Sequence, residues 1–353
     1  MTRSVWAWVR VLGGAAIIAL LAWRLGTGAF LDGLRVIDGG TLLLAFGIGV
    51  TTTVFSAWRW CLVARGLGMR LPLGAAVADY YKALFLNAAL PGGVLGDVDR
   101  AVRHGQGAGD VGRGVRAVVL ERTAGQIVLV AVGVTVLCTV PSPVSGPLQQ
   151  HGPVLALTGA TVAGAAAVVL LAAGRLRRGT SRAARAARTG LAEIRTGLLA
   201  RRTWPGIVLA SAVVLTGHLA TFVVAARAAG SSASLLRLAP LMLLALLAMA
   251  LPLNIGGWGP REGVTAWAFG AAGLSATQGL TIAVVYGVFA FVAALPGAVV
   301  LLTRATAHYR RAAVAPPVAL PVQPVVPAPI TVPVAVPVAV LPAPVRVLAH
   351  SGA

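Results

Sequence analysis

The chain has 353 residues, of which 58% are hydrophobic and 11% are charged, and its mean hydropathy is +0.88. These values exclude a soluble globular domain and are typical of a protein that crosses a membrane several times. The net charge is +20, but the basic residues lie mainly between apolar stretches, so we expect them to face anionic lipid and not nucleic acid.

The N-terminal residues predict a first membrane span. Arg3 and Arg10 precede "VLGGAAIIALLAW", as in a signal peptide, but no clear A-x-A-like cleavage site follows. A span needs about 20 apolar residues. Six stretches meet this requirement, at residues 6–23, 41–63, 117–140, 154–174, 204–226 and 278–303. Cys61 and Cys138 both lie in apolar runs, so neither a disulfide framework nor a metal or cofactor site is predicted.

Charge in the loops predicts the orientation of these spans. The loop 175–203 holds nine arginines and one acidic residue, so the positive-inside rule places it in the cytoplasm. When the chain is followed from there, both termini are cytoplasmic and residues 141–153 and 227–237 are outside. Two shorter apolar segments, 72–90 and 238–253, must then each enter the membrane and return on the same side.

We therefore predict an all-α polytopic membrane protein with about six full spans and two re-entrant, broken-helix hairpins. The hairpins enter from opposite faces, which makes an inverted repeat, and transporters with such repeats bind ligands at the helix breaks. Residues 1–311 would form this transmembrane domain. Residues 312–353 are rich in proline, valine and alanine and predict a disordered cytoplasmic tail.

The first hairpin contains the stretch "NAALPGGVLGDVDR". Asn87 stands before the break, and Gly93 permits a tight turn whose amide groups can meet an anion. Asp97 and Arg100 follow on the returning helix. An arginine within the hydrocarbon costs roughly 2.5–3.5 kcal/mol on insertion scales, so Arg100 either faces a cavity or a partner, or extends to the surface. We expect Arg103 at the lipid interface.

The second hairpin contains "LPLNIGGWGPREGVTAW", with Asn254 and Gly257 at the break. Glu262 lies in the first turn of the returning helix, where the helix dipole favours a negative charge. Arg261 is then free to bind a phosphate; the alternative is a buried pair between Arg261 and an acidic residue. A two-fold axis in the membrane plane would bring Arg100 and Arg261 toward one central cavity.

Further polar residues accompany the third span. Glu121 is interpreted as a surface charge at its cytoplasmic end. Arg122 and Gln126 are four residues apart and share a helix face, so they could line a path for a substrate. The i, i+3 spacing of Asp79 and Lys82 predicts that their charges neutralise each other.

His218 and a D-x-D motif each admit two interpretations. We expect His218 to form a hydrogen bond between helices, the alternative being a proton relay. Asp97-Val98-Asp99 could hold a divalent metal, as in glycosyltransferases, but three residues are a weak signal. The stretch "GQGAGD" lacks the dinucleotide-binding spacing, and there is no P-loop. We therefore expect no enzymatic activity.

Three stretches carry a family resemblance: Asn87 with "LPGGVLGDVDR", "ERTAG" at 121–125, and "LPLNIGGWGPREG" at 251–263. With them the chain resembles, from about residue 10 to 305, the flippase-like proteins related to the transmembrane region of lysylphosphatidylglycerol synthases. The resemblance implies a polytopic protein whose relatives move phospholipids or other lipid-linked substrates between leaflets. A fused aminoacyl-transferase domain makes the lipid in some relatives, and we expect it to be absent here.

The sequence thus predicts a lipid flippase or transporter of the cell membrane. Its partners would be an anionic phospholipid or a polyprenyl-linked lipid, bound by the polar residues of the two hairpins and the third span. The alternative is a non-transporting scaffold or accessory subunit for cell-envelope enzymes.

Overall fold

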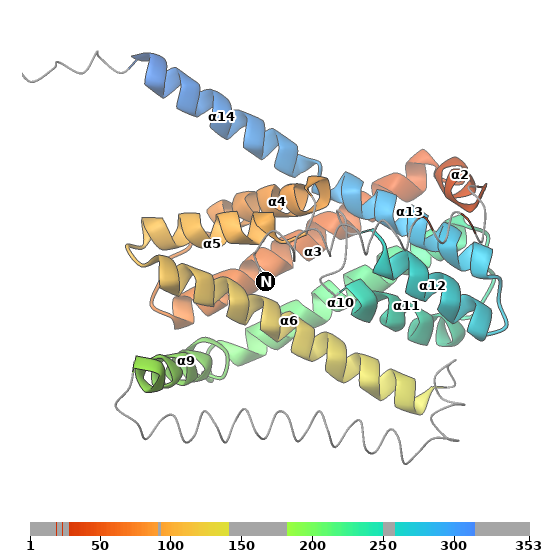
Figure 1. Ribbon diagram of the computed structural model, residues 1–353, viewed down its shortest axis with the longest axis horizontal. Coiled ribbons are helices and arrows are strands. Elements are labelled where there is room, and N and C mark those ends of the chain that lie inside the picture. Colours follow the sequence, from red (N-terminus) through yellow and green to blue (C-terminus); the bar gives the residue numbers. More distant parts are fainter. Residues whose placement is uncertain are drawn as a thin grey trace, which may run out of the picture. The chain divides into compact units, whose positions relative to one another are not determined.

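The computed structural model describes residues 28–90, 93–140, 182–249 and 258–314, together with positions 19 and 23. The elements in these ranges are α-helices (Figure 1). Four apolar helical stretches are long enough to cross a membrane: α3 (Gly39–Gly66), α6 (Val111–Thr139), α10 (Trp204–Ala228) and the run Ala276–Ala307. They confirm four of the predicted spans. The predicted spans 6–23 and 154–174 and the tail 312–353 lie almost wholly outside the described residues.

Shorter helices connect and flank these four stretches. They are α2 (Gly28–Arg35), α4 (Leu73–Ala89), α5 (Leu95–Gly107), α9 (Arg182–Gly197), α11 (Leu235–Met249) and α12 (Pro260–Ala271). The run Ala276–Ala307 itself comprises α13 (Ala276–Ala294) and most of α14 (Pro296–Val314), with a turn at Leu295 between them. The described residues up to Ala307 belong to one compact unit.

Two of the long helices begin at an aspartate cap. Asp38 accepts hydrogen bonds from the amides of Gly40 and Thr41, at 2.7 and 2.9 Å, and Asp110 accepts one from Arg113 at 2.8 Å. These bonds satisfy amides that have no partner within the helix. The hydrogen bond from the backbone amide of Thr41 lowers the pKa of Asp38, and the one from the amide of Arg113 lowers the pKa of Asp110. Both hydrogen bonds favour the charged carboxylate.

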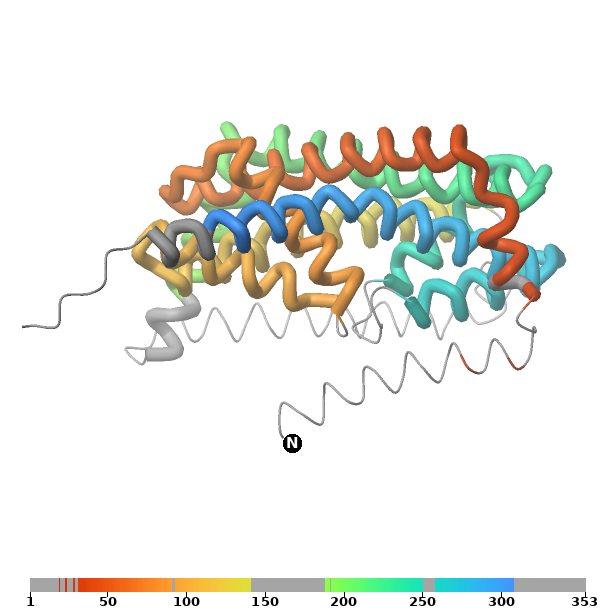
Figure 2. The backbone as a smooth tube through the Cα atoms, turned by 90° about the horizontal axis from the view of Figure 1, so that it is seen from above, coloured from red at the N-terminus to blue at the C-terminus, as the bar shows by residue number. Residues whose placement is uncertain are grey.

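Two helix pairs lie at opposite ends of the bundle. α4 runs from the end where α3 terminates toward the middle, and α5 returns to the same end, where α6 begins (Figure 1). α11 and α12 are arranged in the same way at the other end, between α10 and α13, as Figure 2 also shows. Each pair packs against itself and against its neighbours, α5 on α6 and α12 on α13.

Glycines allow the backbones of these helices to approach closely. A Cβ atom added at Gly96 of α5 would lie 2.1 Å from the carbonyl oxygen of Ala83 in α4. One at Gly114 of α6 would lie 2.4 Å from the carbonyl oxygen of Ala101 in α5. Real Cβ atoms do not approach backbone atoms this closely. The packing of α4, α5 and α6 therefore requires glycine at both positions.

We expect Gly96→Ala to lower the stability of the protein by about 1–3 kcal/mol, because the extra methyl group would push α4 and α5 apart. Thermal unfolding in detergent measures the effect. Gly74→Ala is the matched control, since it lies in α4 with nothing within 4 Å of its added Cβ. The control should be neutral or stabilising by about 0.5–1 kcal/mol. Equal midpoints for the two variants would contradict a tight α4–α5 contact.

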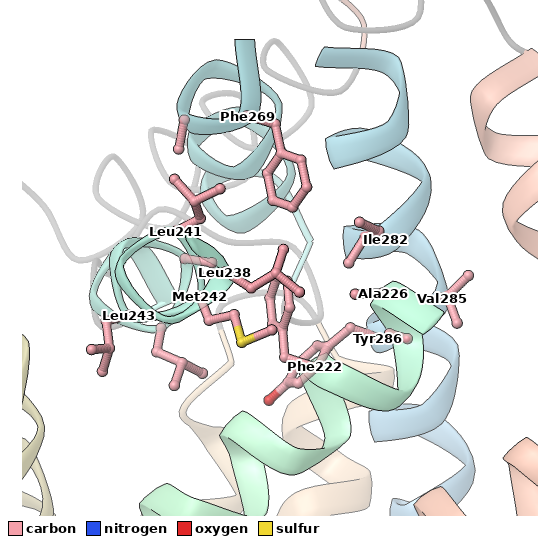
Figure 3. Packing of buried hydrophobic residues seen from close by; sticks show 14 of the residues in the cluster. Phe222, Ala226, Leu238, Leu241, Met242, Leu243, Phe269, Ile282, Val285 and Tyr286 are labelled. Atoms are coloured by element: carbon pink, nitrogen blue, oxygen red, sulfur yellow. The ribbon is translucent and has the colours of Figure 1, made fainter. Parts of the chain in front are cut away.

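The largest buried cluster lies between α10, α11, α12 and α13. Phe222, Leu238, Met242, Phe269 and Tyr286 are among its members (Figure 3). Other large apolar side chains point outward; on α6 these include Val119, Ile127, Val130 and Val134. Such a surface would favour aggregation in water and suits contact with lipid.

Candidate functional site

Glu121 of α6 lies at the centre of a buried charge cluster and has no exposed surface. Its Oε1 accepts hydrogen bonds from Nε and Nη2 of Arg59 in α3, at 3.0 and 2.6 Å. Its Oε2 accepts one from Nη2 of Arg100 in α5, at 2.8 Å. The interpretation of Glu121 as a surface charge was therefore wrong, because two arginines from other helices compensate its burial.

A second carboxylate extends the cluster. Asp97 accepts hydrogen bonds from Nε of Arg100 at 2.8 Å and from Nη2 of Arg122 at 2.7 and 2.9 Å. We call Arg59, Arg100, Arg122, Asp97 and Glu121 the arginine–carboxylate network. It contains three guanidinium groups and two carboxylates, so one positive charge is left over. Among the described residues, Nη1 of Arg100 and Nε of Arg122 have no hydrogen-bond partner although both atoms are buried.

Aromatic rings and an amide support the network. The guanidinium of Arg100 lies 4.5 Å from the ring centroid of Tyr80 and 4.8 Å from that of Trp60, where ring faces attract cations. Asn87 donates to Asp97 at 3.3 Å and accepts from the amide of Gly96 at 2.7 Å. The predicted residues Asn87, Asp97 and Arg100 are therefore brought together across the α4–α5 connection.

Asp79 and Lys82 do not pair with each other as predicted. Lys82 contacts Asp99 of α5 at 2.7 Å, and Asp79 pairs with Arg304 of α14. The i, i+3 spacing gave no information on these distant partners. Asp97 and Asp99 of the D-x-D motif both contact cationic side chains. No group of three potential metal ligands occurs in the described ranges.

Arg261 and Glu262 of α12 form a second buried ion pair. Nε of Arg261 donates to Oε1 of Glu262 at 2.9 Å, and Nη2 contacts the same oxygen. Oε2 of Glu262 accepts from the amide of Gly259 at 2.7 Å, so the carboxylate also caps the helix. The expectation that Arg261 is free was wrong, and the alternative of an internal pair describes the geometry. A role of this pair in head-group binding stays a prediction.

We expect Arg261→Met to lower the free energy of unfolding by about 2–3 kcal/mol, because the buried carboxylate of Glu262 loses its charged donor. The double variant Arg261→Met, Glu262→Gln should recover most of the loss, since glutamine can still accept from Gly259. Thermal unfolding of both variants in detergent measures the difference. A double variant no more stable than the single one would contradict the pairing.

A polar cavity of about 310 Å³ lies beside the network. Its wall includes the charged or polar residues Thr52, Thr53, Ser56, Arg59, Tyr80, Arg122, Gln126, Ser211, His218 and Tyr286. Arg59 also donates from Nη1 to the hydroxyl of Ser211 at 3.1 Å. Arg59 and Arg122 are charged residues of the described wall, and the carboxylates paired with them, Glu121 and Asp97, do not line it.

Of the two arginines on this wall, Arg122 was predicted as a site residue and Arg59 was not. Arg100 and Arg261 were expected to meet in one cavity, but neither lines it; Arg59 and Arg122 do. Sequence reasoning missed Arg59, although an arginine inside an apolar run is itself a sign of function because of its cost in lipid. His218 accepts or donates a hydrogen bond with the hydroxyl of Tyr286 at 2.9 Å, which confirms its predicted contact between helices.

An apolar groove of about 980 Å³ adjoins the polar cavity. Most of its lining is valine, alanine and isoleucine from α5 and α6. Arg122 and Gln126 line both the groove and the cavity. The prediction that these two residues share a face holds, and that face separates a polar space from an apolar one.

Three more residues were predicted to belong to the site: Gly93, Asn254 and Gly257. Gly93 adopts φ 60°, a left-handed conformation that favours glycine, in the turn between α4 and α5. Asn254 and Gly257 lie outside the described residues.

Residues 7–297 match the family model described as the lysylphosphatidylglycerol synthase TM region. No curated protein and no solved structure matches the chain.

Proposed function

Because the chain belongs to the family of the lysylphosphatidylglycerol synthase transmembrane region, we propose that it moves a lipid between the leaflets of the cytoplasmic membrane. The substrate would be an anionic phospholipid or a polyprenyl-linked lipid with an anionic head group. The protein would act as a flippase or transporter and not as an enzyme. Family membership supports a function related to membrane lipids.

The observation that carries this proposal is the contact between the polar cavity and the apolar groove. A lipid has a charged part that must exchange water for other hydrogen-bond donors and an apolar part that needs none. Arg59 and Arg122 offer charge-assisted donors in the cavity. The groove between α5 and α6 offers an apolar surface directly beyond Arg122 and Gln126. One lipid molecule could use both.

We further propose that the α4–α5 and α11–α12 pairs are re-entrant hairpins of an inverted repeat. The four helices have 17, 13, 15 and 12 residues, fewer than the ~20 that a full crossing requires. With both termini and the loop 175–203 in the cytoplasm, the α10–α11 connection would face outward. A cysteine introduced at Ser232, in a chain lacking Cys61 and Cys138, should then react with an impermeant thiol reagent in intact cells; protection there would overturn the orientation.

Transport is tested with the purified full chain in liposomes. Fluorescent phosphatidylglycerol and phosphatidylcholine are placed in both leaflets, and an impermeant quencher reports how fast the inner pool reaches the outside. We expect faster movement of the anionic lipid than in protein-free liposomes, with less effect on the zwitterionic one. If no tested head group moves, the protein is a scaffold or accessory subunit and not a transporter.

A further inference from the structure

A second polar hollow lies at the end of the bundle where α3 leads into α4 and α5 leads into α6. Its volume is about 470 Å³, within the range of small-molecule sites. Its chemically distinctive lining residues are Arg70, Asp79, Arg103, His104, Gly107 and Arg113. It shares no lining residue with the polar cavity or the apolar groove. We call it the loop pocket.

The charges of the loop pocket are not balanced. Arg70 comes from the α3–α4 connection, Arg103 from the last turns of α5, and Arg113 from the first turn of α6. Within the described ranges, neither Arg70 nor Arg103 has a hydrogen bond or an ion pair, whereas Arg113 contacts Asp110 at 3.4 Å. The single lining carboxylate, Asp79, is paired with Arg304. Two guanidinium groups therefore face a concave space without a counter-charge.

A buried donor or acceptor beside the pocket also has no partner. Nε2 of His104 is buried and makes no hydrogen bond among the described residues, while its ring contacts Trp60 edge-on at 5.3 Å between centroids. Native proteins rarely leave such an atom unsatisfied, so an unpartnered one often indicates a missing ligand or water. Gly107 has nothing within 4 Å of an added Cβ, so this part of the wall is open.

We propose that the loop pocket binds a phosphate-bearing anion. Arginine is suited to this ligand because its planar fork donates two parallel hydrogen bonds to phosphate oxygens. Arginines that only fix the orientation of a membrane protein need to lie on one side of the membrane. They do not need to converge on one hollow from three separate segments. The phosphate is either that of a soluble small molecule or that of a lipid head group.

Binding of pyrophosphate to the detergent-solubilised full chain tests the site, at constant ionic strength set with sodium chloride. We expect saturable binding that is at least about tenfold weaker in the double variant Arg70→Gln, Arg103→Gln, because each lost fork removes charge-assisted hydrogen bonds. Arg201→Gln, Arg202→Gln is the matched control: it removes the same charge from exposed positions outside the pocket. Gly107→Leu should also block binding, by filling the open wall.

The source of the phosphate is tested in phosphatidylcholine nanodiscs with or without phosphatidic acid. If a lipid head group is the ligand, phosphatidic acid should raise the unfolding temperature of the wild type more than that of the double variant and should compete with pyrophosphate. If the ligand is soluble, phosphatidic acid should leave pyrophosphate binding unchanged. The proposal is overturned if neither probe binds the wild type, or if the pocket variants and the control respond alike. These outcomes do not depend on lipid transport.

Discussion

Replacing Glu121 by alanine is expected to lower the free energy of unfolding by about 3–5 kcal/mol, the usual cost of removing one partner from a buried ion pair. Arg59 loses the acceptor of its Nε and Nη2 donors, and Arg100 keeps only Asp97. Three helices, α3, α5 and α6, lose their common charged contact. Denaturant or thermal unfolding in detergent measures the loss, and Glu121→Gln should cost less because it keeps the shape and one acceptor oxygen.

Glu193→Ala is the control for this prediction. Glu193 of α9 contacts Arg116 at 2.6 Å, but that arginine is 38% exposed, and partly exposed pairs contribute only ~0–1 kcal/mol. Equal losses of stability for Glu121→Ala and Glu193→Ala would show that burial does not make the Glu121 contacts more important than an ordinary surface pair.

Replacing Arg122 by glutamine is expected to slow lipid movement by about 10–100-fold, the effect of losing hydrogen bonds from a charged donor, about 1.5–3 kcal/mol. The side chain of Arg122 is 41% exposed and lies where the polar cavity meets the apolar groove. Its loss should leave the fold intact, since Asp97 keeps its bond from Arg100 and Glu121 keeps two arginines. Arg122→Lys should have an intermediate effect, because it retains the charge without the fork.

The control variant for Arg122 is Arg116→Gln. Arg116 lies on the same helix, and its replacement removes the same charge. It contacts Glu193 and lines neither the polar cavity nor the apolar groove. The liposome assay gives the rate, and the unfolding temperature reports stability. A normal rate in Arg122→Gln, with the wild type active, would remove Arg122 from the lipid path without contradicting transport itself.

Apolar runs and helix breaks could be predicted from the sequence because they depend on neighbouring residues. Hydropathy identified α3, α6 and α10 to within six residues at each end. α4 and α5, which lie on either side of the predicted break after Asn87, pack against each other; that they form a re-entrant hairpin stays a prediction.

Ion-pair partners could not be predicted in the same way, because they depend on how distant helices pack. Asp79 and Arg304 are 225 residues apart in sequence, and the two arginines that pair with the buried Glu121, Arg59 and Arg100, come from other helices. The pairing of Arg261 with Glu262 is local, yet the sequence favoured a free arginine and gave the pair only as the alternative. The polar cavity has the same origin: its wall combines residues of α3, α4, α6, α10, α11 and α13.

The apolar run Ala276–Ala307 has 32 residues, and a continuous helix of that size is about 48 Å long. The hydrocarbon layer of a typical bilayer measures ~30 Å. The turn at Leu295 divides the run, so that α13, with 19 residues, matches that layer almost without tilt. The first part of α14 remains apolar beyond it. We therefore expect lipids with long acyl chains to cover more of this surface than short-chain lipids do, since hydrophobic mismatch costs free energy.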